Sequence, residues 1–442
     1  MSLNQFNIDI INAPEAPDAR VIRAQMRLST HWRLSHIAIQ TSEGEYSDDH
    51  PDVRNAVHCK DLVESDSGLI VYYISPVLKE EYRCPCCGNS AIPISYKTRR
   101  YKHVVDKGFQ CMLAVNLPKL KCCNCGGTPQ LRFPAADPGK SYTRPLAQAV
   151  IAALRSKTKS AVAKEFYLHT DTVDAILNDA VKSALCEQDL SYVTGVYVDE
   201  TQFGHGQDYI SVFVDQRHKV IFMCKGHSQD SLELFRDHLI VQGGDPESIR
   251  FFSADMSRAY EAGITKLFPN ADLVWDRFHL AKAVNEAVNN IRKQLIRRNK
   301  DEHLSLTKYI FLRHEKDLTD AQADRLREIR LTNPEMALAY DMKEAFLEIM
   351  KINDPDIMLN RLFEWVEWVK ESGHEYLKRK AKTFCDKFDR IVAWTRHPVS
   401  NSVCEGINKN IQDARRQAYG YKSVNNFYSL IFIRQGDLTF RF

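Results

Sequence analysis

Three carboxylates lie far apart in the sequence, yet their types and surroundings suit a site for divalent cations: Asp199, Asp255 and Glu405. Asp199 follows the apolar run VYV and Asp255 follows FFSA, so each comes where a strand-like segment ends. Side chains at the ends of such strands collect ligands in mixed α/β sheets. A set of carboxylate oxygens prefers Mg²⁺ or Mn²⁺ to zinc. The pattern therefore predicts a magnesium or manganese site.

Glu405 belongs to the stretch NSVCEGINKNIQDARRQAYGYKS (401–423), whose periodicity predicts an amphipathic helix. Its apolar stripe consists of Val403, Ile407, Ile411, Ala414 and Ala418. Glu405 is on the opposite side, and its polar neighbours there are Asn401, Asn408, Lys409, Gln412, Arg415 and Arg416. A solvated helix face would explain this pattern as well, but the two upstream aspartates favour a functional carboxylate.

Two divalent ions roughly 3.5–4 Å apart can activate a water or a 3′-hydroxyl for in-line attack on a phosphodiester. We expect Asp199 to bridge both ions, and Asp255 and Glu405 to hold one each. The segment DRFH (276–279) offers two accessory candidates, Asp276 at the end of the next strand and His279 one turn later. His279 would orient a phosphate or donate to Asp276, or else it is simply a packed histidine.

A second metal site is indicated by CPCCG (84–88) and CCNCG (122–126), each a CxxC pair followed by glycine. The expected ligands of one structural zinc ion are Cys84, Cys87, Cys122 and Cys125. Cys86 and Cys123 leave the pairing open by one residue, and redox-active or free thiols are the alternative. Seven of the twelve cysteines lie between Cys84 and Cys125. With no recognisable export signal, this clustering favours thiolates in a reducing compartment over disulfides.

The segment 142–185 has the pattern of a DNA-binding helix-turn-helix, and a plain helical bundle is the alternative. Ala161, Val162 and Phe166 are expected to pack the first helix, and Thr170 to cap the second. The second helix would enter a major groove and contact DNA through Thr170 and Thr172.

We assign residues 192–442 to the catalytic domain. Three strand-like runs at 195–203, 208–215 and 219–226 indicate an antiparallel meander, after which helices and strands alternate. The order β-β-β-α-β-α-β-α is that of an RNase H-like, retroviral-integrase-type fold, in which the first strand lies beside the fourth. A helical insertion is expected at about 292–395. Before this domain, we assign 81–135 to a zinc ribbon and leave 1–80 without a role.

Net charge alone implies no partner, because the 442 residues carry 60 Lys and Arg against 57 Asp and Glu. The distribution is more informative: seven basic residues and one acid lie between Lys97 and Lys121, and six against one between Lys282 and Lys300. Such clusters suit phosphate backbones, although ordinary surface lysines would also explain them. No apolar run approaches the roughly 18 residues that a membrane span needs, so no membrane partner is expected.

The motifs together resemble the ISL-three family of bacterial insertion-sequence transposases. The resemblance runs in the family's order from about Cys84 to the C-terminus. Its motifs are CPCCG and CCNCG, the helix-turn-helix, VDET (198–201), SADMSRAY (253–260), DRFHLAKAVN (276–285) and CEGINKNIQDARRQAYGYKS (404–423).

The resemblance implies a DDE triad of Asp199, Asp255 and Glu405 with two Mg²⁺ or Mn²⁺ ions. It further implies that zinc ribbon and helix-turn-helix bind the element's terminal inverted repeats, and that 3′-hydroxyls freed there attack target DNA. Phosphates near the scissile bond would be contacted by Lys409, Arg415 and Arg416. A homodimer or larger synaptic complex and a cytoplasmic, nucleoid-associated bacterial location are expected. The alternatives are a non-catalytic DNA-binding regulator derived from a transposase and an RNase H-like structure-specific nuclease.

Overall fold

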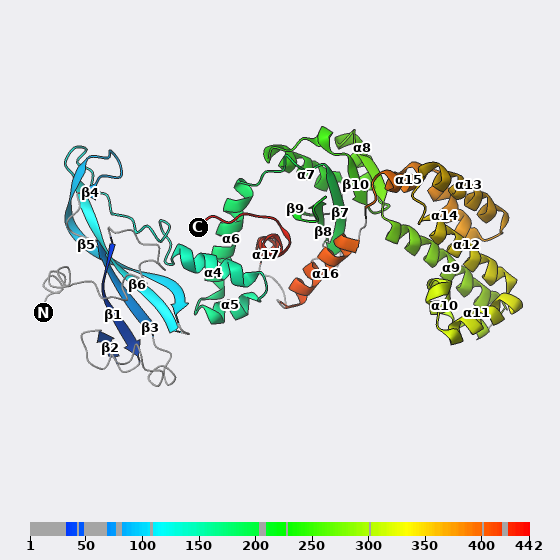
Figure 1. Ribbon diagram of the computed structural model, residues 1–442, viewed down its shortest axis with the longest axis horizontal. Coiled ribbons are helices and arrows are strands. Elements are labelled where there is room, and N and C mark those ends of the chain that lie inside the picture. Colours follow the sequence, from blue (N-terminus) through cyan, green and yellow to red (C-terminus); the bar gives the residue numbers. More distant parts are fainter. Residues whose placement is uncertain are drawn as a thin grey trace. The chain divides into compact units, whose positions relative to one another are not determined.

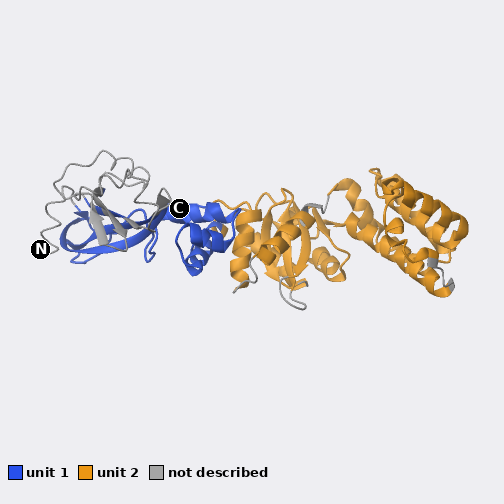
Figure 2. Cartoon of the chain, turned by 90° about the horizontal axis from the view of Figure 1, so that it is seen from below, with its two compact units in different colours: residues 1–184, 440–442 blue, residues 185–439 orange. Residues whose placement is uncertain are grey.

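The computed structural model describes residues 32–41, 44–47, 69–76, 82–106, 109–202, 209–226, 229–299, 302–399, 402–417 and 423–442. The chain divides into two compact units, residues 1–184 with 440–442 and residues 185–439 (Figure 2). Most of the segment 1–80, for which the sequence predicts no role, lies outside the described residues.

The first unit contains a six-stranded sheet in the order β2-β1-β3-β6-β5-β4. Its strands are β1 (Trp32–Thr41), β2 (Gly44–Ser47), β3 (Leu69–Pro76), β4 (Tyr82–Arg83), β5 (Ser90–Asp106) and β6 (Phe109–Cys122). β3 and β6 run parallel, and the other neighbouring pairs are antiparallel. The region assigned to a zinc ribbon thus shares one sheet with strands from the segment before it.

Three helices follow in the first unit: α4 (Arg144–Leu154), α5 (Lys159–Glu165) and α6 (Thr170–Cys186). The side chain of Thr158 caps α5, which buries Val162 and Ala163. Ala161 is exposed, so the prediction that it packs inward is wrong, because the apolar side of this short helix lies one and two residues further on. The carbonyl of His169 accepts the first bonds of α6. Thr170 is therefore the first residue of the helix and not its cap.

The second unit is built on a five-stranded mixed sheet in the order β11-β10-β7-β8-β9 (Figure 1). Its strands are β7 (Gly195–Gln202), β8 (Tyr209–Asp215), β9 (Val220–Lys225), β10 (Phe251–Ala254) and β11 (Asp272–Trp275). β7, β8 and β9 form the predicted antiparallel meander. β10 pairs in parallel with both β7 and β11. The fourth strand therefore lies beside the first, as the sequence predicts.

The two faces of this sheet are covered differently. Helices α7 (Gln229–Val241) and α8 (Arg258–Leu267) pack on one face, where the rings of Phe213 and Phe235 stack at 4.5 Å. Helix α16 (Ser402–Gln417) lies against β7 on the other, as its hydrogen bonds to that strand require. Because side chains alternate along a strand, β7 sends Val196 and Val198 into the apolar core and residues 199 and 201 toward α16.

The stretch between β11 and α16 is helical, as predicted, although its first helix begins well before residue 292. The helices are α9 (Arg277–Asn299), α10 (Lys308–Leu312), α11 (Asp320–Thr332), α12 (Pro334–Ile349), α13 (Pro355–Glu371), α14 (Glu375–Cys385) and α15 (Phe388–Arg396). Strong N-terminal signals start several of them, including a capping box of Thr319 with Gln322. Helix α17 (Val424–Gln435) closes the unit. Among the described helices of the chain, none combines the length and apolar character that crossing a membrane requires.

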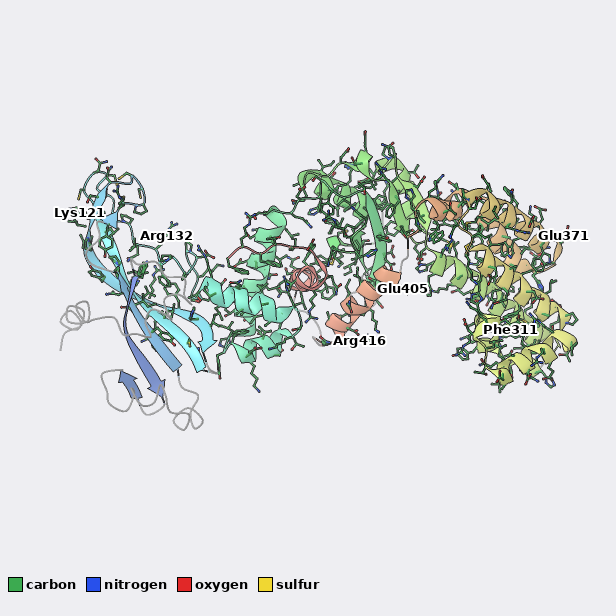
Figure 3. All side chains as sticks on the ribbon, in the orientation of Figure 1. Lys121, Arg132, Phe311, Glu371, Glu405 and Arg416 are labelled. Atoms are coloured by element: carbon green, nitrogen blue, oxygen red, sulfur yellow. The ribbon has the colours of Figure 1, made fainter. Side chains whose placement is uncertain are left out.

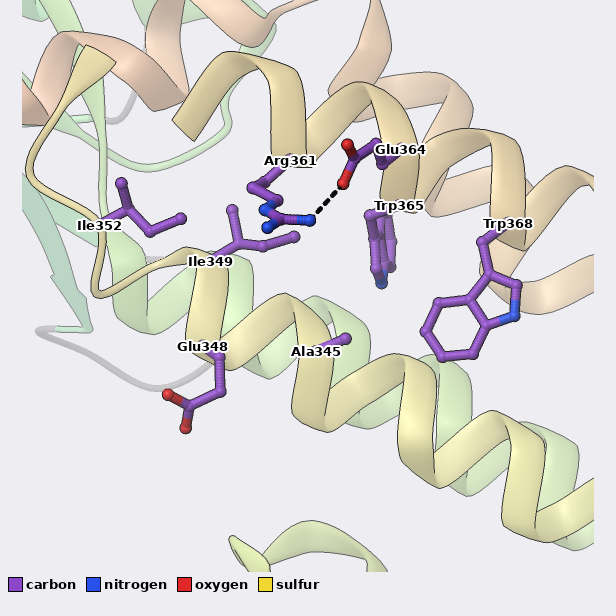
Figure 4. Close-up of a pocket in the computed structure, with 8 residues that line it drawn as sticks. All are labelled: Ala345, Glu348, Ile349, Ile352, Arg361, Glu364, Trp365 and Trp368. Carbon is purple, nitrogen blue, oxygen red and sulfur yellow. Dashed lines mark hydrogen bonds and ion pairs between the residues drawn. The ribbon is translucent and has the colours of Figure 1, made fainter. Parts of the chain in front are cut away.

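Helices α12 and α13 leave a shallow groove of about 590 Å³ between them (Figure 4). Its walls are mainly apolar, from Ile349, Trp365 and Trp368, and Arg361 and Glu364 pair at 2.7 Å on its side. All residues that line it belong to the insertion or to the turn after α12, and none to the sheet or to α16. The groove is therefore separate from the carboxylates described below.

Replacing Gly195 by alanine should destabilise the sheet, because a Cβ at this position would lie 2.1 Å from Cε1 of Phe251 on the neighbouring strand. The Phe251 ring also packs against Tyr197 and His397, so it has little freedom to move. We expect a loss of about 1–3 kcal/mol in the free energy of unfolding. Thermal unfolding measures it, and the variant should have a lower melting temperature for the second unit than the wild type.

Two further variants check this explanation. Combining Gly195→Ala with Phe251→Leu should recover part of the loss, because the smaller side chain leaves room for the new methyl group. Gly406→Ala should not destabilise, since a Cβ there meets nothing within 4 Å. Equal melting temperatures of Gly195→Ala and the wild type would contradict the proposed clash.

Candidate active site

The parallel pairing of β7, β10 and β11 brings three aspartates to the same level of the sheet. Ser253 is aligned with Tyr197, so two residues further Asp255 is level with Asp199. Ala254 is aligned with Trp275, so Asp276 is in turn level with Asp255. Neighbouring strands are about 4.7–4.9 Å apart, which places these carboxylates within strong electrostatic range of one another.

The acidity of Asp199 is strongly perturbed. The pKa of its carboxyl is raised to about 6, mainly by burial and to a smaller extent by the negative charges of Asp255 and Asp276. The backbone N–H of Glu200, which donates to Oδ1 at 2.8 Å, and the charge of His279 act in the opposite direction. The site is therefore short of positive charge around Asp199.

Asp276 and His279 form a hydrogen-bonded pair beside Asp255. Asp276 is buried, and its carboxylate bonds His279 Nδ1 at 2.7 Å and accepts from the backbone N–H of Phe278 at 3.1 Å. The same Nδ1 lies 3.5 Å from Oδ1 of Asp255. The hydrogen bond to Asp276, followed by the charge of Asp255, raises the pKa of His279. His279 is thus held by carboxylates, and it is not merely packed.

Glu200 lies on the other face of the sheet, as the alternation along a strand predicts. It is paired in register with Ser211, whose hydroxyl is 3.0 Å from the Tyr260 hydroxyl on α8. Burial, with the neighbouring Glu200 carboxylate, raises the pKa of Tyr260. Glu200 therefore belongs to the α8 side of the sheet and not to the cluster around Asp199.

Polar side chains of α16 tie this helix to β7. Asn408 Nδ2 donates to Asp199 Oδ2 at 2.7 Å, and Gln412 Nε2 donates to Thr201 Oγ1 at 2.5 Å. Arg415 Nη1 donates to the carbonyl of Gln202 at 3.0 Å. These three residues share one side of the helix, because they are spaced by four and three positions.

Glu405 precedes Asn408 by three residues, so the two side chains are neighbours on the helix, with Cβ atoms about 5–6 Å apart. Glu405 is exposed and lies near one end of α16, with Arg416 near the other (Figure 3). The ligand atoms of Asp199, Asp255 and Glu405 do not all lie within 4.8 Å of one another in the structure. The chain thus brings Glu405 to the neighbourhood of Asp199 without closing a three-carboxylate cluster.

The predicted apolar stripe of α16 is confirmed where it is described: Ile407, Ile411 and Ala414 are buried. The side chain of Val403, together with Ala418, lies outside the described residues. On the polar side Lys409 and Arg416 are exposed, whereas Arg415 is engaged with the backbone of β7. Arg415 therefore has a structural contact that its sequence position does not reveal.

The structure brings the four predicted zinc-binding sulfurs together. All four Sγ atoms, of Cys84, Cys87, Cys122 and Cys125, lie within 4.8 Å of one another. The Sγ atoms of Cys87 and Cys122 are 3.4 Å apart. Among the residues that the structure describes, no other group of three or more His, Cys, Asp or Glu side chains has its ligand atoms this close together. The ambiguity over Cys86 is thereby removed, since its sulfur is not in the cluster.

Backbone N–H groups favour the thiolate form of Cys84 and Cys87, whereas the neighbouring sulfurs raise the pKa of Cys125. The glycines after each pair, Gly88 and Gly126, have φ values of 72° and 66°, which side chains with a Cβ rarely adopt. Backbone N–H groups point at the sulfurs, such as Cys86 N at 3.4 Å from Cys84 Sγ. The N–H of Asn89 and the neighbouring Cys122 lower the pKa of the Cys87 thiol to about 6.

In the helix-turn-helix, the acidic residues of α6 are partly neutralised from within the unit. Asp174 pairs with Lys159 of α5 at 2.6 Å, and Asp179 pairs with Lys140. Thr170 is exposed and Thr172 is half-buried, so both are near the surface at the start of α6. The ion pairs reduce the repulsion that these aspartates would exert on phosphates.

Asn408 and Gln412 have contacts to β7 that sequence reasoning does not identify. Both stand on the polar side of the predicted helix, but amides in that position look like ordinary surface residues. The signal that was present is the spacing Glu405-x-x-Asn408-x-x-x-Gln412, which puts two amides on the same side as the carboxylate.

Comparison with known proteins gives concordant matches. A family described as "Transposase" matches residues 196–431, and the helix-turn-helix domain of transposase family ISL3 matches residues 131–181. The transposase for insertion sequence element IS1001 of Bordetella parapertussis is 27% identical over 373 residues, 83% of this chain and 91% of that protein. The transposase for insertion sequence element IS1557 of Mycobacterium tuberculosis is 23% identical over 415 residues, 86% of this chain and 92% of that protein.

The acidity of Asp199 predicts a stability gain for Asp199→Asn. With the pKa raised from 3.8 to about 6 in the fold, the protonated form contributes stability that is full below pH 3.8 and lost as the pH rises through 6. Asparagine mimics the neutral form at every pH. Without added divalent cations at pH 7.5, the free energy of unfolding of the variant should exceed that of the wild type by up to about 3 kcal/mol, and its melting temperature should be higher. The difference should shrink toward pH 4.

Asp255→Asn is the matched control, because the Asp255 side chain is 44% exposed and its charge is better solvated. Its gain at pH 7.5 should be smaller. An unchanged or lowered melting temperature of Asp199→Asn at pH 7.5 would show that the ionised carboxylate is not a cost to the fold.

Proposed function

The chain belongs to the ISL3 family of transposases, and from that premise we propose that it cuts the ends of an insertion sequence and joins them to target DNA in a divalent-metal-dependent reaction. The helix-turn-helix domain implies DNA binding. Its DNA is proposed to be the terminal inverted repeats of the element, with Thr170 and Thr172 at the groove. Strand transfer needs two ends held together, so the active form is a homodimer or a larger synaptic complex.

The observation that supports this proposal best is the alignment of Asp199 and Asp255 on β7 and β10, with α16 bonded to Asp199 through Asn408. The strand order and the alternation of strands and helices support an RNase H-like core. In this reading Asp199, Asp255 and Glu405 form the DDE triad, although they are scattered over two strands and a distant helix.

The donor set fits two Mg²⁺ or Mn²⁺ ions, because it consists of carboxylate oxygens, and burial together with the charges of Asp255 and Asp276 raises the pKa of Asp199. Asp199, Asp255 and Glu405 would hold them, and bound ions would supply activation of the attacking oxygen and neutralisation of the leaving one. Asn408 orients the Asp199 carboxylate through its amide. Asp255 and Glu405 would hold different ions, so the three carboxylates need not all lie within 4.8 Å of one another.

Asp276 and His279 act as accessory residues. Asp276 fixes the imidazole of His279 through Nδ1, and His279 in turn stands beside Asp255. This arrangement orients the ring and keeps its positive charge close to the aspartates. Lys409 and Arg416, which are exposed on α16, are placed to meet phosphates of the DNA, and Arg415 does so only if it leaves the Gln202 carbonyl.

The four-cysteine cluster holds one structural zinc ion. Four thiolates at this spacing form a closed tetrahedral donor set, so the metal stabilises the two knuckles at the end of β6 and before β5. Zinc here serves DNA binding by ordering the hairpin of β5 and β6, which carries most of the basic residues between Lys97 and Lys121. It takes no part in the cleavage chemistry.

The catalytic proposal predicts that Asp199→Asn and Glu405→Gln each abolish Mg²⁺-dependent cleavage of element ends while leaving end binding intact, because each removes one anionic ligand without disturbing the helix-turn-helix. Cleavage is measured on a duplex that carries an inverted repeat flanking the reading frame, and binding on the same duplex by gel shift. Asp413→Asn, which changes an acid on the same helix, is the control and should cleave normally.

Cleavage by Asp199→Asn at the wild-type rate would remove Asp199 from the site. A wild type that binds ends without cutting them under any divalent ion would favour the non-catalytic regulator. Cutting of branched DNA without need of the repeats would favour the structure-specific nuclease.

The zinc proposal predicts that replacing Cys84 and Cys87 by serine releases the metal and weakens binding to the element ends. Replacing Cys86 and Cys123 by serine should keep one zinc per chain, since their sulfurs lie outside the cluster. Zinc content is measured by elemental analysis of the purified protein. Full zinc occupancy after loss of Cys84 and Cys87 would mean that other residues bind it.

A further inference from the structure

Arg277, the first residue of α9, is a cation without an acceptor. Its guanidinium lies over the ring of Trp394, with Cζ 3.0 Å from the ring centroid. Its Nε and Nη2 are buried, and neither bonds any group in the described part of the chain. The residue directly follows Asp276, so its backbone adjoins the aspartate cluster.

Such an arrangement is costly in the free protein. Burial lowers the pKa of Arg277 to about 10, and no carboxylate offsets that effect. A buried donor without an acceptor costs roughly 1–3 kcal/mol. Two other partly buried arginines of the unit differ from it: Arg330 bonds Glu315 and Asp341, and Arg292 bonds the carbonyl of Leu304 at 2.7 Å. The Nε and Nη2 groups of Arg277 therefore lack acceptors, which an anionic oxygen from outside the chain would supply.

The next residue, Phe278, presents an aromatic surface to solvent at the same place. Its side chain is 54% exposed, which is unusual for phenylalanine in this unit. The ring stands edge-on to His279 with centroids 5.6 Å apart, and His279 is bonded to Asp276 and adjacent to Asp255. An exposed aromatic face beside a DNA-cutting site can stack on a nucleobase, an interaction worth about 1–3 kcal/mol.

We propose that Arg277 and Phe278 together grip one nucleotide next to the scissile bond, Arg277 through its phosphate and Phe278 through its base. This inference rests on the proposed DNA cleavage at Asp199 and Asp255. A free phosphate would satisfy Arg277 alone, whereas a nucleotide accounts for both the missing acceptor and the exposed ring. When its side chain rotates outward, the N–H edge of the guanidinium can form two parallel bonds to a phosphate.

The grip makes a specific demand on the DNA. Phe278 can stack only on a base that has left the duplex stack, at a cost of a few kcal/mol. The gripped nucleotide is therefore one that the reaction already loosens, at the end of the element next to the cut. Arg277 is only partly buried as a residue, so a side-chain rotation is enough to bring its donors to such a phosphate.

The test uses the full-length protein and a duplex spanning one inverted repeat, without added Mg²⁺ so that binding is measured apart from cleavage. The adenine analogue 2-aminopurine is placed next to the cleavage site opposite a gap in the other strand, so that it is unpaired and fluoresces until an aromatic side chain stacks on it. In a second series, single phosphates around that site are replaced by uncharged methylphosphonates. The variants are Arg277→Gln, Phe278→Ala and Phe278→Trp. Controls are Arg361→Gln and Tyr309→Ala, an exposed arginine and an exposed tyrosine of the insertion.

Phe278→Ala should lose the 2-aminopurine quenching that the wild type and Phe278→Trp show. One methylphosphonate should weaken wild-type binding by about tenfold to a hundredfold, the effect expected for a charge-assisted hydrogen bond. Arg277→Gln should bind the natural duplex as weakly, and the same methylphosphonate should cause it no further loss. Both controls should behave as the wild type.

The proposal is overturned if every methylphosphonate affects Arg277→Gln as it affects the wild type, or if Phe278→Ala quenches fully. If Arg277→Gln folds poorly, Arg277→Lys takes its place, and the critical methylphosphonate should weaken its binding less than that of the wild type, because lysine cannot form two parallel bonds to a phosphate. A wild type that cuts in an Asp199-dependent manner but shows none of these effects would refute the grip alone. A wild type that shows them without cutting would refute the proposed cleavage and keep the grip.

Discussion

The carboxylates of Asp199, Asp255 and Asp276 repel one another, and the parallel strands β7, β10 and β11 hold them at one level in spite of that repulsion. Burial and the neighbouring negative charges raise the pKa of Asp199 to about 6, well above the value of an ordinary aspartate. The backbone N–H of Glu200 and the cationic form of His279 relieve the repulsion only in part. Any positive charge that enters this part of the sheet is therefore favoured, which is the electrostatic basis of a cation site.

The sheet can tolerate that cost because its opposite face is firmly packed. Val196 and Val198 of β7 point into a core that includes Phe213, Phe235 and Phe252, all fully buried. On the other face, α16 is joined to β7 by a row of polar bonds from Asn408, Gln412 and Arg415. The strand is thus anchored by apolar contacts on one side, while the helix that carries Glu405 is anchored by hydrogen bonds on the other.

The helical insertion begins directly after Asp276, and at its end Arg396 and His397 bond Asp272 at the other end of β11. Arg277 at its start stacks on Trp394 near its end, so the two connections to the sheet are in contact. Inside the insertion, the fully buried Lys343 is compensated by carbonyls of Phe311 and Arg313 and by Glu344, which fixes the segment before α11 to α12. A rigid insertion clamped at its base keeps Trp394 and α16 in a defined relation to Asp276, and with it the spacing between the aspartates and Glu405.

The sequence by itself determined the elements and the residue types: the alternating strands, the amphipathic helix around Glu405, the paired cysteines and the acidic residues at strand ends. These follow from local periodicity and from spacing within a few residues, which are properties of the sequence and do not depend on the fold. Even so, helix starts were displaced by a residue at Thr170, and the inward side of α5 was misplaced at Ala161, because propensity does not locate the packing partner. Only the tertiary structure decided that Asn408 bonds Asp199, that Cys86 stays out of the sulfur cluster, and that Arg277 rests on Trp394 without an acceptor. Each of these joins residues that the sequence separates or leaves equivalent, and their distances depend on how the whole core packs, which no local pattern encodes.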